Sequence, residues 1–415
     1  MNKLKHLLSM LGPGLMWAGA AVGVSHLVQS TRAGGLYGFA LVGVVIFSNL
    51  IKYPFFEFAP RYAAATGQHL IVGYKAVGKW AVALYGIFTF LTMFAIQAAV
   101  TVVTASIVGN VFGLDLSLVT ISGLILLIIM AVIAIGKYSL IDGLMKIIIL
   151  TLTISTIVAV ASALKIGYHP NPEFEIPFSW SDASALAFVI ALAGWMPAPI
   201  DISVWHSFWS FAKQKESGKA ISLKNALFDF NVGYFGTALL ALGFLTLGAI
   251  LMYGSGQQFS DKGSVFAGQL IQLYTQSIGA WAYVVIAIAA LATMFSTSLT
   301  CLDAYSRVLA PTTEILFPKS NALGKKLSWI WLIVVVVGSL FLIGVFAESM
   351  TFMVDLATTI SFVTAPVLAY LNYKAVMSKD MPEDAKPSKF LRIYAQLGIV
   401  FLSLFSLGFL YWRFF

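Results

Sequence analysis

The stretch GPGLMWAGAAVGVSHLVQSTR, residues 12–32, is long enough to cross a bilayer, yet polar residues interrupt it. Gly23, Ser25 and His26 lie near its centre, and Gln29 follows within one helical turn. Polar groups at membrane depth are costly unless they line a cavity or a pathway. A helix can end there only if its freed backbone groups find partners in protein or solute. The stretch therefore predicts a discontinuous helix at a transport site rather than a lipid anchor.

The composition of the 415-residue chain indicates an integral membrane protein. Hydrophobic residues make up 60% of it and charged residues only 10%, whereas soluble proteins carry about 25% charged residues. The one cysteine, Cys301, excludes a disulfide within the chain and a multi-cysteine metal site. The basic start runs into a full-length apolar stretch without a small-residue cleavage pattern, so we expect no cleavable signal.

Eleven apolar stretches approach the length of about 20 residues that a bilayer-crossing helix needs. They lie at residues 12–33, 36–58, 82–112, 118–135, 142–165, 183–211, 226–252, 278–308, 327–346, 350–373 and 391–412. We therefore predict an all-α integral membrane protein with 11 transmembrane helices, whose two termini lie on opposite sides of the membrane.

The basic residues are distributed unevenly between the two sides. If the N-terminus is cytoplasmic, only Arg32, Lys165, Lys262 and Arg413 of the 25 lysines and arginines lie outside. Basic residues accumulate on the cytoplasmic side of membrane proteins. We therefore predict a protein of the plasma (inner) membrane with a cytoplasmic N-terminus and an extracytoplasmic C-terminus. The net charge of +8 therefore reflects the orientation of the chain in the lipid bilayer, and we expect no nucleic-acid partner.

The sixth apolar stretch is interrupted like the first, by GWMPAP at residues 194–199. Two prolines within three residues remove backbone donors and clash with the preceding turn, although a simple kink is the alternative. Two interrupted helices five apart and opposite in direction are typical of inverted five-helix repeats with a site at the midplane. We expect one transmembrane transporter domain over residues 1–415, with a first inverted repeat at 12–165, a second at 183–373 and an additional helix at 391–412.

Two motifs lie at a characteristic spacing near the start of the chain, GPG at residues 12–14 and RAGGLYGF at residues 32–39. They resemble the Gly-Pro-Gly opening and the glycine-rich Tyr-Gly turn of the Nramp family of divalent-metal transporters. Residues 61–67, the pair His206-Ser207 and residues 362–366 add to the resemblance. It implies a LeuT-type fold with broken helices 1 and 6, and secondary active transport in which helices 1, 2, 6 and 7 rock against the rest.

The chain departs from the family pattern at the metal site. Where the resemblance implies Asp-Pro-Gly-Asn in the first broken helix, this chain has GVSH, so Gly23 stands in place of the metal-binding Asp. The family's Met-Pro-His aligns either with Met196-Pro197-Ala198 or so that Asp201 takes the place of the His, and the register stays open. Outside the breaks, the resemblance implies two acidic residues on a proton path, where this chain has Gln97 and Val100. It also implies a Gln in helix 10, where this chain has Met353.

We expect the substrate site at the two breaks and on the tenth apolar stretch. Its candidate residues are Gly23, Val24, Ser25, His26, Gln29, Trp195, Met196, Pro197, Ala198, Asp201 and Met353. One histidine without an acidic partner binds a divalent cation poorly, and a structural role for His26 is the alternative. The N-termini of the half-helices supply positive partial charge and free N–H groups. These features favour a small oxyanion or zwitterion, for example bicarbonate.

Uptake of an anion requires a driving ion, because an inside-negative membrane opposes it by about 2.3 kcal/mol per charge per 100 mV. LeuT-like transporters hold a sodium ion between hydroxyls of helix 8 and carbonyls of helix 1, and Ala20, Gly23, Thr297 and Ser298 resemble that arrangement. Helix packing by serine and threonine is the alternative. We expect sodium as the coupling ion, no other cofactor, and a monomer.

Few acidic residues lie within the apolar stretches. Asp201 and Asp355 lack a sequence neighbour of opposite charge, so each could complete a proton or cation site. Asp303 lies four residues before Arg307 and is expected to pair with it. Asp229, near a predicted cytoplasmic helix end, is expected to cap a helix or to pair.

The sequence thus predicts an Nramp-related symporter that takes up a small polar solute or anion, bicarbonate-like and sodium-driven. The first alternative is a transporter of magnesium or manganese that uses Asp201 or Asp355 in place of the missing Asp. The second is a solute sensor that has lost transport. We expect no enzyme, because the sequence contains no nucleophile–base–acid constellation and no phosphate-binding glycine loop.

Overall fold

The computed structural model describes residues 12–135, 138–218, 220–257, 259–346 and 349–414. These residues are mostly helical and contain no strand. In chain order the helices are α2 (Pro13–Ala21), α3 (Thr31–Tyr37), α4 (Val42–Thr66), α5 (Leu70–Val77), α6 (Lys79–Phe112), α7 (Leu118–Ile135), α8 (Tyr138–Ile166), α9 (Ala183–Trp195), α10 (Ile202–Ser217), α11 (Leu223–Leu251), α12 (Gly263–Ile278), α13 (Tyr283–Leu316), α14 (Lys325–Phe346), α15 (Met350–Val376) and α16 (Lys389–Phe414).

Short helical turns connect some of these helices. The π-helical turn η1 (Ser25–Ser30) joins α2 to α3, and four 3₁₀ turns lie in loops: Pro172–Phe174, Ala280–Ala282, Pro318–Leu323 and Glu383–Ala385. Two helices lie outside the eleven predicted stretches, α5 and α12. With 8 and 16 residues they fall short of a bilayer-crossing length, which explains why the apolar pattern missed them.

Nine helices of the described residues are long and apolar enough to cross a membrane, judged by length and composition. The two interrupted stretches are not among these nine, because each is divided into shorter helices. The prediction of 11 crossings, the repeat boundaries and the cytoplasmic N-terminus therefore stay predictions.

Both predicted breaks are present. The first helix ends at Ala21, Val22 has non-helical φ and ψ of −80° and 79°, and helical structure resumes with η1 at Ser25. The sixth stretch is helical to Trp195 and again from Ile202. The six residues between them contain the cis peptide bond Met196-Pro197. Two short unwound segments thus replace the middle of two membrane helices.

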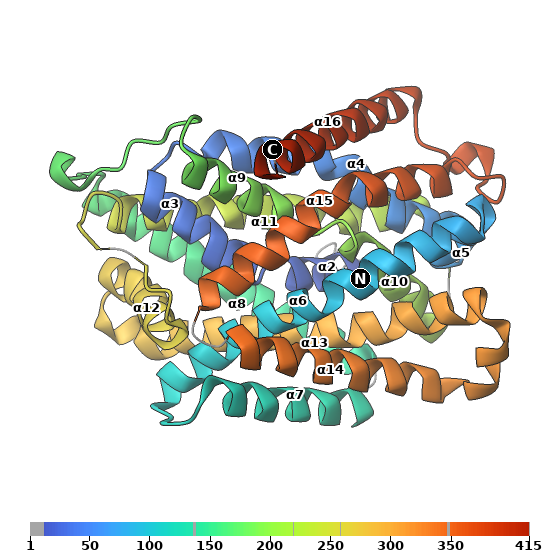
Figure 1. The fold of residues 1–415 in the computed structure, drawn as a ribbon, viewed down its shortest axis with the longest axis horizontal. Helices are drawn as coiled ribbons and strands as arrows, with labels where there is room; N and C mark the ends of the chain where they lie inside the picture. Colours follow the sequence, from blue (N-terminus) through green and yellow to red (C-terminus); the bar gives the residue numbers. More distant parts are fainter. Residues whose placement is uncertain (1–11, 136–137, 219, 258, 347–348, 415) are drawn as a thin grey trace, which may run out of the picture.

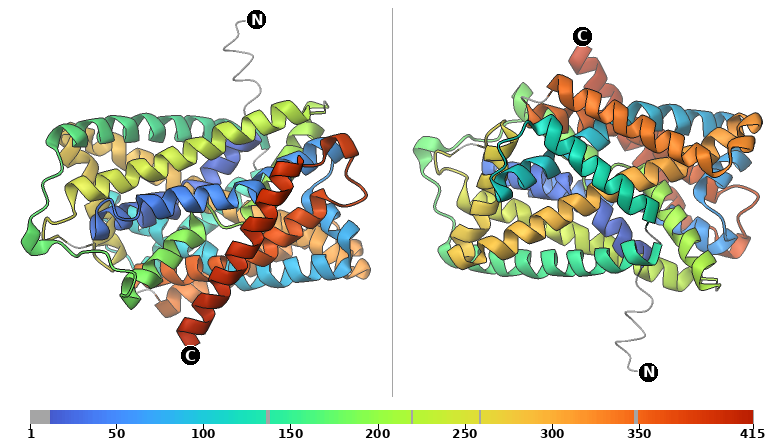
Figure 2. Two further views of the ribbon diagram at one scale, coloured as in Figure 1. Left: turned by 90° about the horizontal axis from the view of Figure 1, so that it is seen from above. Right: turned by 90° about the horizontal axis from the view of Figure 1, so that it is seen from below.

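The helices run mainly along one common direction, with α16 at one edge of the bundle and α7 at the other (Figure 1). α16 contacts α4 and α15, and α7 contacts α6 and α14. The two views in Figure 2 show α16 on the outside of the bundle. α2 lies inside, where it contacts α8, α10, α11 and α13. The first broken helix is therefore enclosed by protein rather than by lipid.

Both halves of this helix pack on α11 with backbone touching backbone. A Cβ atom added to Gly34 of α3 would lie 1.9 Å from the carbonyl oxygen of Leu245, and one added to Gly248 would lie 2.2 Å from that of Thr31. Gly14 of α2 is equally close to α11. Glycine is needed at these positions because any side chain would separate the helices.

Candidate functional site

The imidazole of His26 has both ring nitrogens engaged at the first break. Nδ1 lies 2.7 Å from Oγ of Ser25, and Nε2 lies 3.0 Å from the carbonyl oxygen of Thr237 on α11. The side chain is fully buried. His26 therefore ties η1 to α11 in this conformation, as the structural alternative predicted, and offers no free nitrogen to a metal ion.

Ser25 brings the two breaks together. Its hydroxyl lies 2.7 Å from the carbonyl oxygen of Ala21 and 3.5 Å from that of Pro197 in the sixth break. The predicted meeting of the two unwound segments is thus present, with Ser25 and Pro197 at their point of contact.

Thr297 of α13 fills the space beside Gly23. A Cβ atom at Gly23 would lie 2.7 Å from Cγ2 and 2.8 Å from Oγ1 of Thr297. Oγ1 of Thr297 lies 3.2 Å from the carbonyl oxygen of Gly19, 3.5 Å from that of Val22 and 2.9 Å from that of Thr293. The predicted contact between α13 and the first helix is present, but through the carbonyls of Gly19 and Val22 instead of Ala20 and Gly23.

Ser298 does not join this contact, contrary to the prediction for a sodium site. Its hydroxyl lies 2.8 Å from Oγ1 of Thr104 on α6. Successive residues of an α-helix point about 100° apart, so Ser298 and Thr297 face different neighbours. Only Thr297 of the two hydroxyls is directed at the first broken helix.

Several other predicted site residues are packing residues here. Ala20, Val24, Ala198 and Met353 are part of the main buried apolar core. Met196 belongs to a second buried cluster that includes Ala33 and Tyr37.

Trp195 is held at the end of α9. Its indole N–H donates to Oγ of Ser361 on α15 at 2.8 Å. This bond fixes the end of α9 against α15.

Asp201 lies at the end of the sixth break and is 3% exposed. Neither carboxylate oxygen forms a hydrogen bond. A buried carboxylate without a bonded partner is a candidate for function. Asp201 is therefore the predicted site residue with the most coordinating capacity left.

Lys52 is a site residue that the sequence analysis missed. It lies midway along α4, is 1% exposed, and its Nζ donates to the carbonyl oxygens of Ala193 (2.6 Å) and Gly194 (2.8 Å). The distribution of basic residues places Lys52 on the cytoplasmic side. A lone lysine inside the apolar stretch 36–58 was the signal that could have identified it.

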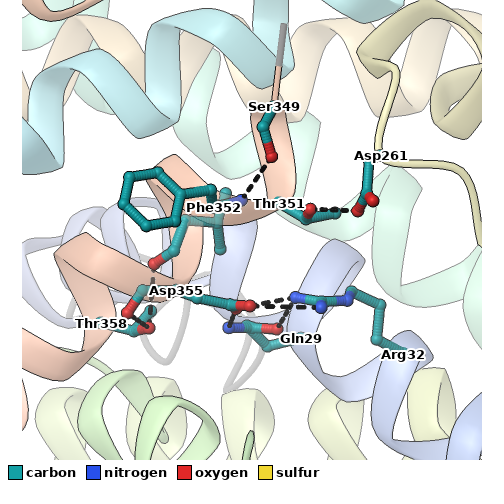
Figure 3. Close-up of polar contacts among 9 residues, drawn as sticks. Gln29, Arg32, Asp261, Ser349, Thr351, Phe352, Asp355 and Thr358 are labelled. Atoms are coloured by element: carbon teal, nitrogen blue, oxygen red, sulfur yellow. Dashed lines mark hydrogen bonds and ion pairs between the residues drawn. The ribbon is translucent and has the colours of Figure 1, made fainter. Parts of the chain in front are cut away.

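Near the C-terminal end of the first broken helix, Gln29 and Arg32 converge on Asp355 of α15 (Figure 3). Arg32 donates to Oδ1 of Asp355 at 2.8 Å and to Oδ2 at 3.3 Å, and Nε2 of Gln29 donates to Oδ1 at 2.8 Å. Arg32 also donates to Oε1 of Gln29 at 2.9 Å and lies over the ring of Phe188. Asp355 therefore has partners that were not evident from the sequence, and Gln29 binds it here.

The N-terminal end of the first broken helix is joined to α11 by Asp229. Its Oδ1 accepts from the N–H of Gly12 at 2.9 Å, and its Oδ2 accepts from that of Gly14 at 2.8 Å. Asp229 thus caps a helix, as predicted, and this helix is more than two hundred residues away in the sequence. The predicted pair between Asp303 and Arg307 is also confirmed, at 2.6 Å.

We expect removal of the Asp355 carboxylate to open its end of the first helix. In a Cys301→Ser background, a cysteine placed at Ser25 should react faster with an impermeant thiol reagent once Asp355→Ala is added. The expected increase is about two- to fivefold, because the side chain of Asp355 is 37% exposed and partly exposed ion pairs contribute only about 0.2–1 kcal/mol.

The control for this experiment is Thr351→Ala. It removes the neighbouring bond from Thr351 to Asp261, also drawn in Figure 3, and leaves Arg32 paired. Equal labelling rates with and without Asp355→Ala would show that this network does not hold the end closed.

No group of three or more histidine, cysteine, aspartate or glutamate side chains is arranged to hold a metal ion within the part of the chain that the structure describes.

Solved structures with the same arrangement of helices are membrane transporters. A variant of the manganese transporter of Eremococcus coleocola superposes with a TM-score of 0.71 over 98% of this chain and 87% of that one, at 14% identity. MhsT in complex with L-phenylalanine gives 0.63 over 95% and 98%, at 17% identity. Mhp1, a nucleobase-cation-symport-1 family transporter, gives 0.59 over 97% and 92%, at 14% identity. The protein is therefore an all-α membrane protein with a LeuT-type fold, as predicted.

Residues 14–412 match the family model described as natural resistance-associated macrophage protein-like. The chain belongs to the Nramp family of membrane transporters. A relative in Pasteurella multocida, described as an uncharacterized protein, is 37% identical over 406 residues, which are 96% of this chain and 91% of the relative.

These comparisons refine the functional prediction. Family and structural relatives are transporters, which agrees with the expectation that the chain is not an enzyme. They give no support to sodium coupling or to a bicarbonate-like substrate. The divalent-metal alternative is supported at least as well by the family to which the chain belongs.

Proposed function

We propose that this protein transports a divalent metal cation, magnesium or manganese, through an Nramp site rearranged around Asp201. Membership of the Nramp family supports metal-ion transport. The observation that carries the proposal is the buried Asp201 carboxylate, whose two oxygens have no hydrogen-bond partner at the break between α9 and α10.

The oxygen atoms near this break suit a hard cation. Magnesium is bound by one or two carboxylates and keeps several of its waters, and manganese accepts similar ligands. Asp201 would supply the carboxylate that the first break lacks at Gly23. The carbonyl oxygens of Ala193 and Gly194, which bind Lys52 in this structure, are additional ligands once the ammonium moves away.

Alternating access follows from two contacts at opposite ends of the first broken helix. Arg32 with Asp355 joins one end to α15, and Asp229 joins the other end to α11 through the N–H groups of Gly12 and Gly14. With the predicted cytoplasmic N-terminus, the Asp229 contact lies toward the cytoplasm. Opening one contact while the other stays closed would expose the site to one side at a time. The division into inverted repeats at 12–165 and 183–373 is part of this proposal.

The test is flux of manganese and magnesium into proteoliposomes that contain purified protein. Asp201→Asn should reduce metal flux at least about tenfold, since even loss of groups that only orient a metal ligand lowers affinity about 10–100-fold. Asp303→Asn is the matched control, because Asp303 pairs with Arg307 one turn later on the same helix. Wild-type vesicles that take up neither metal, or an Asp201→Asn variant with full flux, would contradict the proposal.

A sodium-driven anion transporter remains the second candidate. The observation that favours it is the first break itself, where Thr297 fills the space beside Gly23 and its hydroxyl lies 3.2 Å from the carbonyl oxygen of Gly19 on α2. Labelled bicarbonate is therefore tested in the same vesicles with and without an inward sodium gradient. Sodium-dependent bicarbonate uptake without metal flux would replace the metal proposal, and binding without flux would indicate a sensor.

A further inference from the structure

The buried ammonium group of Lys52 needs compensation that α4 itself does not provide. It lies in the middle of a 25-residue membrane helix and is 1% exposed. An ammonium group has three donors and no acceptor. Charged groups at such depth are costly unless they pair with other charges or with backbone carbonyls. The partners of Lys52 therefore show what kind of site it occupies.

Two of these partners are the carbonyl oxygens of Ala193 and Gly194, in the last turn of α9. The last four carbonyls of a helix have no partner within the helix, and this end carries about half a negative charge. It is a place that attracts cations even without a carboxylate.

The end of α9 is held rigidly on α15. A Cβ atom at Gly194 would lie 2.0 Å from the carbonyl oxygen of Thr358, so the two backbones are in direct contact. The indole of Trp195 adds its bond to Ser361. The two carbonyl groups are therefore fixed in position independently of Lys52.

Asp201 supplies the negative charge on the other side of the same break. Its carboxylate is buried and has no hydrogen-bond partner. At one end of the sixth break two fixed carbonyls bind one ammonium group, and a buried carboxylate lies at the other end.

We propose that the sixth break is a monovalent-cation site, defined by Ala193, Gly194 and Asp201, which the chain fills with its own cation, the ammonium of Lys52. Monovalent cations from solution bind there only when the Lys52 side chain no longer carries this ammonium. The inference goes beyond the proposed function, because it concerns the charge that occupies the break without substrate. Its test measures cation binding rather than flux, so it can fail while metal transport is found, and the reverse.

The experiment compares the thermal unfolding midpoint of purified wild-type protein and of Lys52→Met in chloride salts of ammonium, potassium, sodium and choline. Methionine keeps the apolar stem and removes the charge. Wild type should unfold at the same midpoint in all four salts. Lys52→Met should unfold earlier than wild type in choline. Its midpoint should rise with the logarithm of the concentration of ammonium, potassium or sodium, as expected for a ligand that binds only the folded state.

Two further variants make the result specific to the site. Lys374→Met removes an exposed lysine near the end of α15 and should behave like wild type in every salt. Lys52→Met combined with Asp201→Asn removes both charges. This double variant should unfold later than Lys52→Met in choline and should lose most of the response to small cations.

Several outcomes would overturn the inference. These are an equal midpoint of Lys52→Met in all four salts, or a full cation response in the double variant. If Lys52→Met is not recovered from membranes in any salt while the double variant is, free cations do not replace the ammonium. If neither variant is recovered from membranes in any salt, the inference is also contradicted, because it requires that Lys52 contributes only its charge to the folded protein.

Discussion

Replacing Gly248 with alanine should destabilise the protein by about 3 kcal/mol or more, the upper part of the range for an overfilled core. The added Cβ atom would lie 2.2 Å from the carbonyl oxygen of Thr31 and 2.9 Å from the backbone nitrogen of Gly35. Both atoms belong to the backbone of α3, so no side-chain rotation can relieve the clash. The two helices must separate, and the contact of the first broken helix with α11 is lost along its second half.

The matched control is Gly236→Ala, on the same helix. No heavy atom lies within 4 Å of a Cβ atom built on Gly236. Alanine is favoured over glycine within a helix by about 1 kcal/mol, so this variant should be as stable as wild type or more stable. The measurement is the thermal unfolding midpoint of each purified variant in the same detergent. Equal midpoints for the two alanine variants would show that the close helix contact is not tight in the folded protein.

The sequence predicted the architecture well, because its strongest signals are local. Apolar stretches of membrane length, and the polar residues or prolines that interrupt two of them, depend only on neighbouring residues. The break after Ala21 and the break between Trp195 and Ile202 overlap those interruptions, displaced by one or two residues. Helices α5 and α12 were missed because they are too short for the bilayer pattern that identified the others.

The partners of the polar residues could not be predicted in the same way. Asp355 binds Arg32, which is 323 residues away, and Lys52 binds carbonyl oxygens about 140 residues away. A single sequence shows that such a residue needs a partner, but not which one the fold supplies. Backbone carbonyls are invisible to any reasoning from side-chain types, since every residue has one.

Helical geometry explains the mixed outcome for the predicted sodium site. Thr297 and Ser298 are adjacent in the sequence, but one faces the first broken helix and the other faces α6. A pattern of neighbouring hydroxyls therefore predicted one contact correctly and one wrongly. The resemblance predicts that Gly23 stands in place of a carboxylate, whereas the side chain that fills the space beside Gly23, Thr297, became evident only from the fold.

Replacing Asp229 with alanine should detach the start of the first helix from α11 and destabilise the protein by about 2 kcal/mol or more. The change removes both acceptors of the N–H groups of Gly12 and Gly14. Loss of a helix N-cap costs about 0.5–2 kcal/mol, and a hydrogen bond to a charged group contributes about 1.5–3 kcal/mol. Asp229→Asn keeps one carbonyl oxygen as an acceptor, so its effect should be intermediate.

Because Asp229 holds one end of the first helix closed in this structure, its loss should also change access to that helix. In a Cys301→Ser background, a cysteine at the buried position Ala18 should react faster with a thiol reagent applied from the predicted cytoplasmic side. Asn225→Ala, one turn earlier on α11, is the control and should change neither the unfolding midpoint nor the labelling rate. If Asp229→Ala lowers stability without faster labelling, the carboxylate stabilises a helix end that does not open. If labelling rises together with a fall in flux, the Asp229 contact is one of the two that must close in turn.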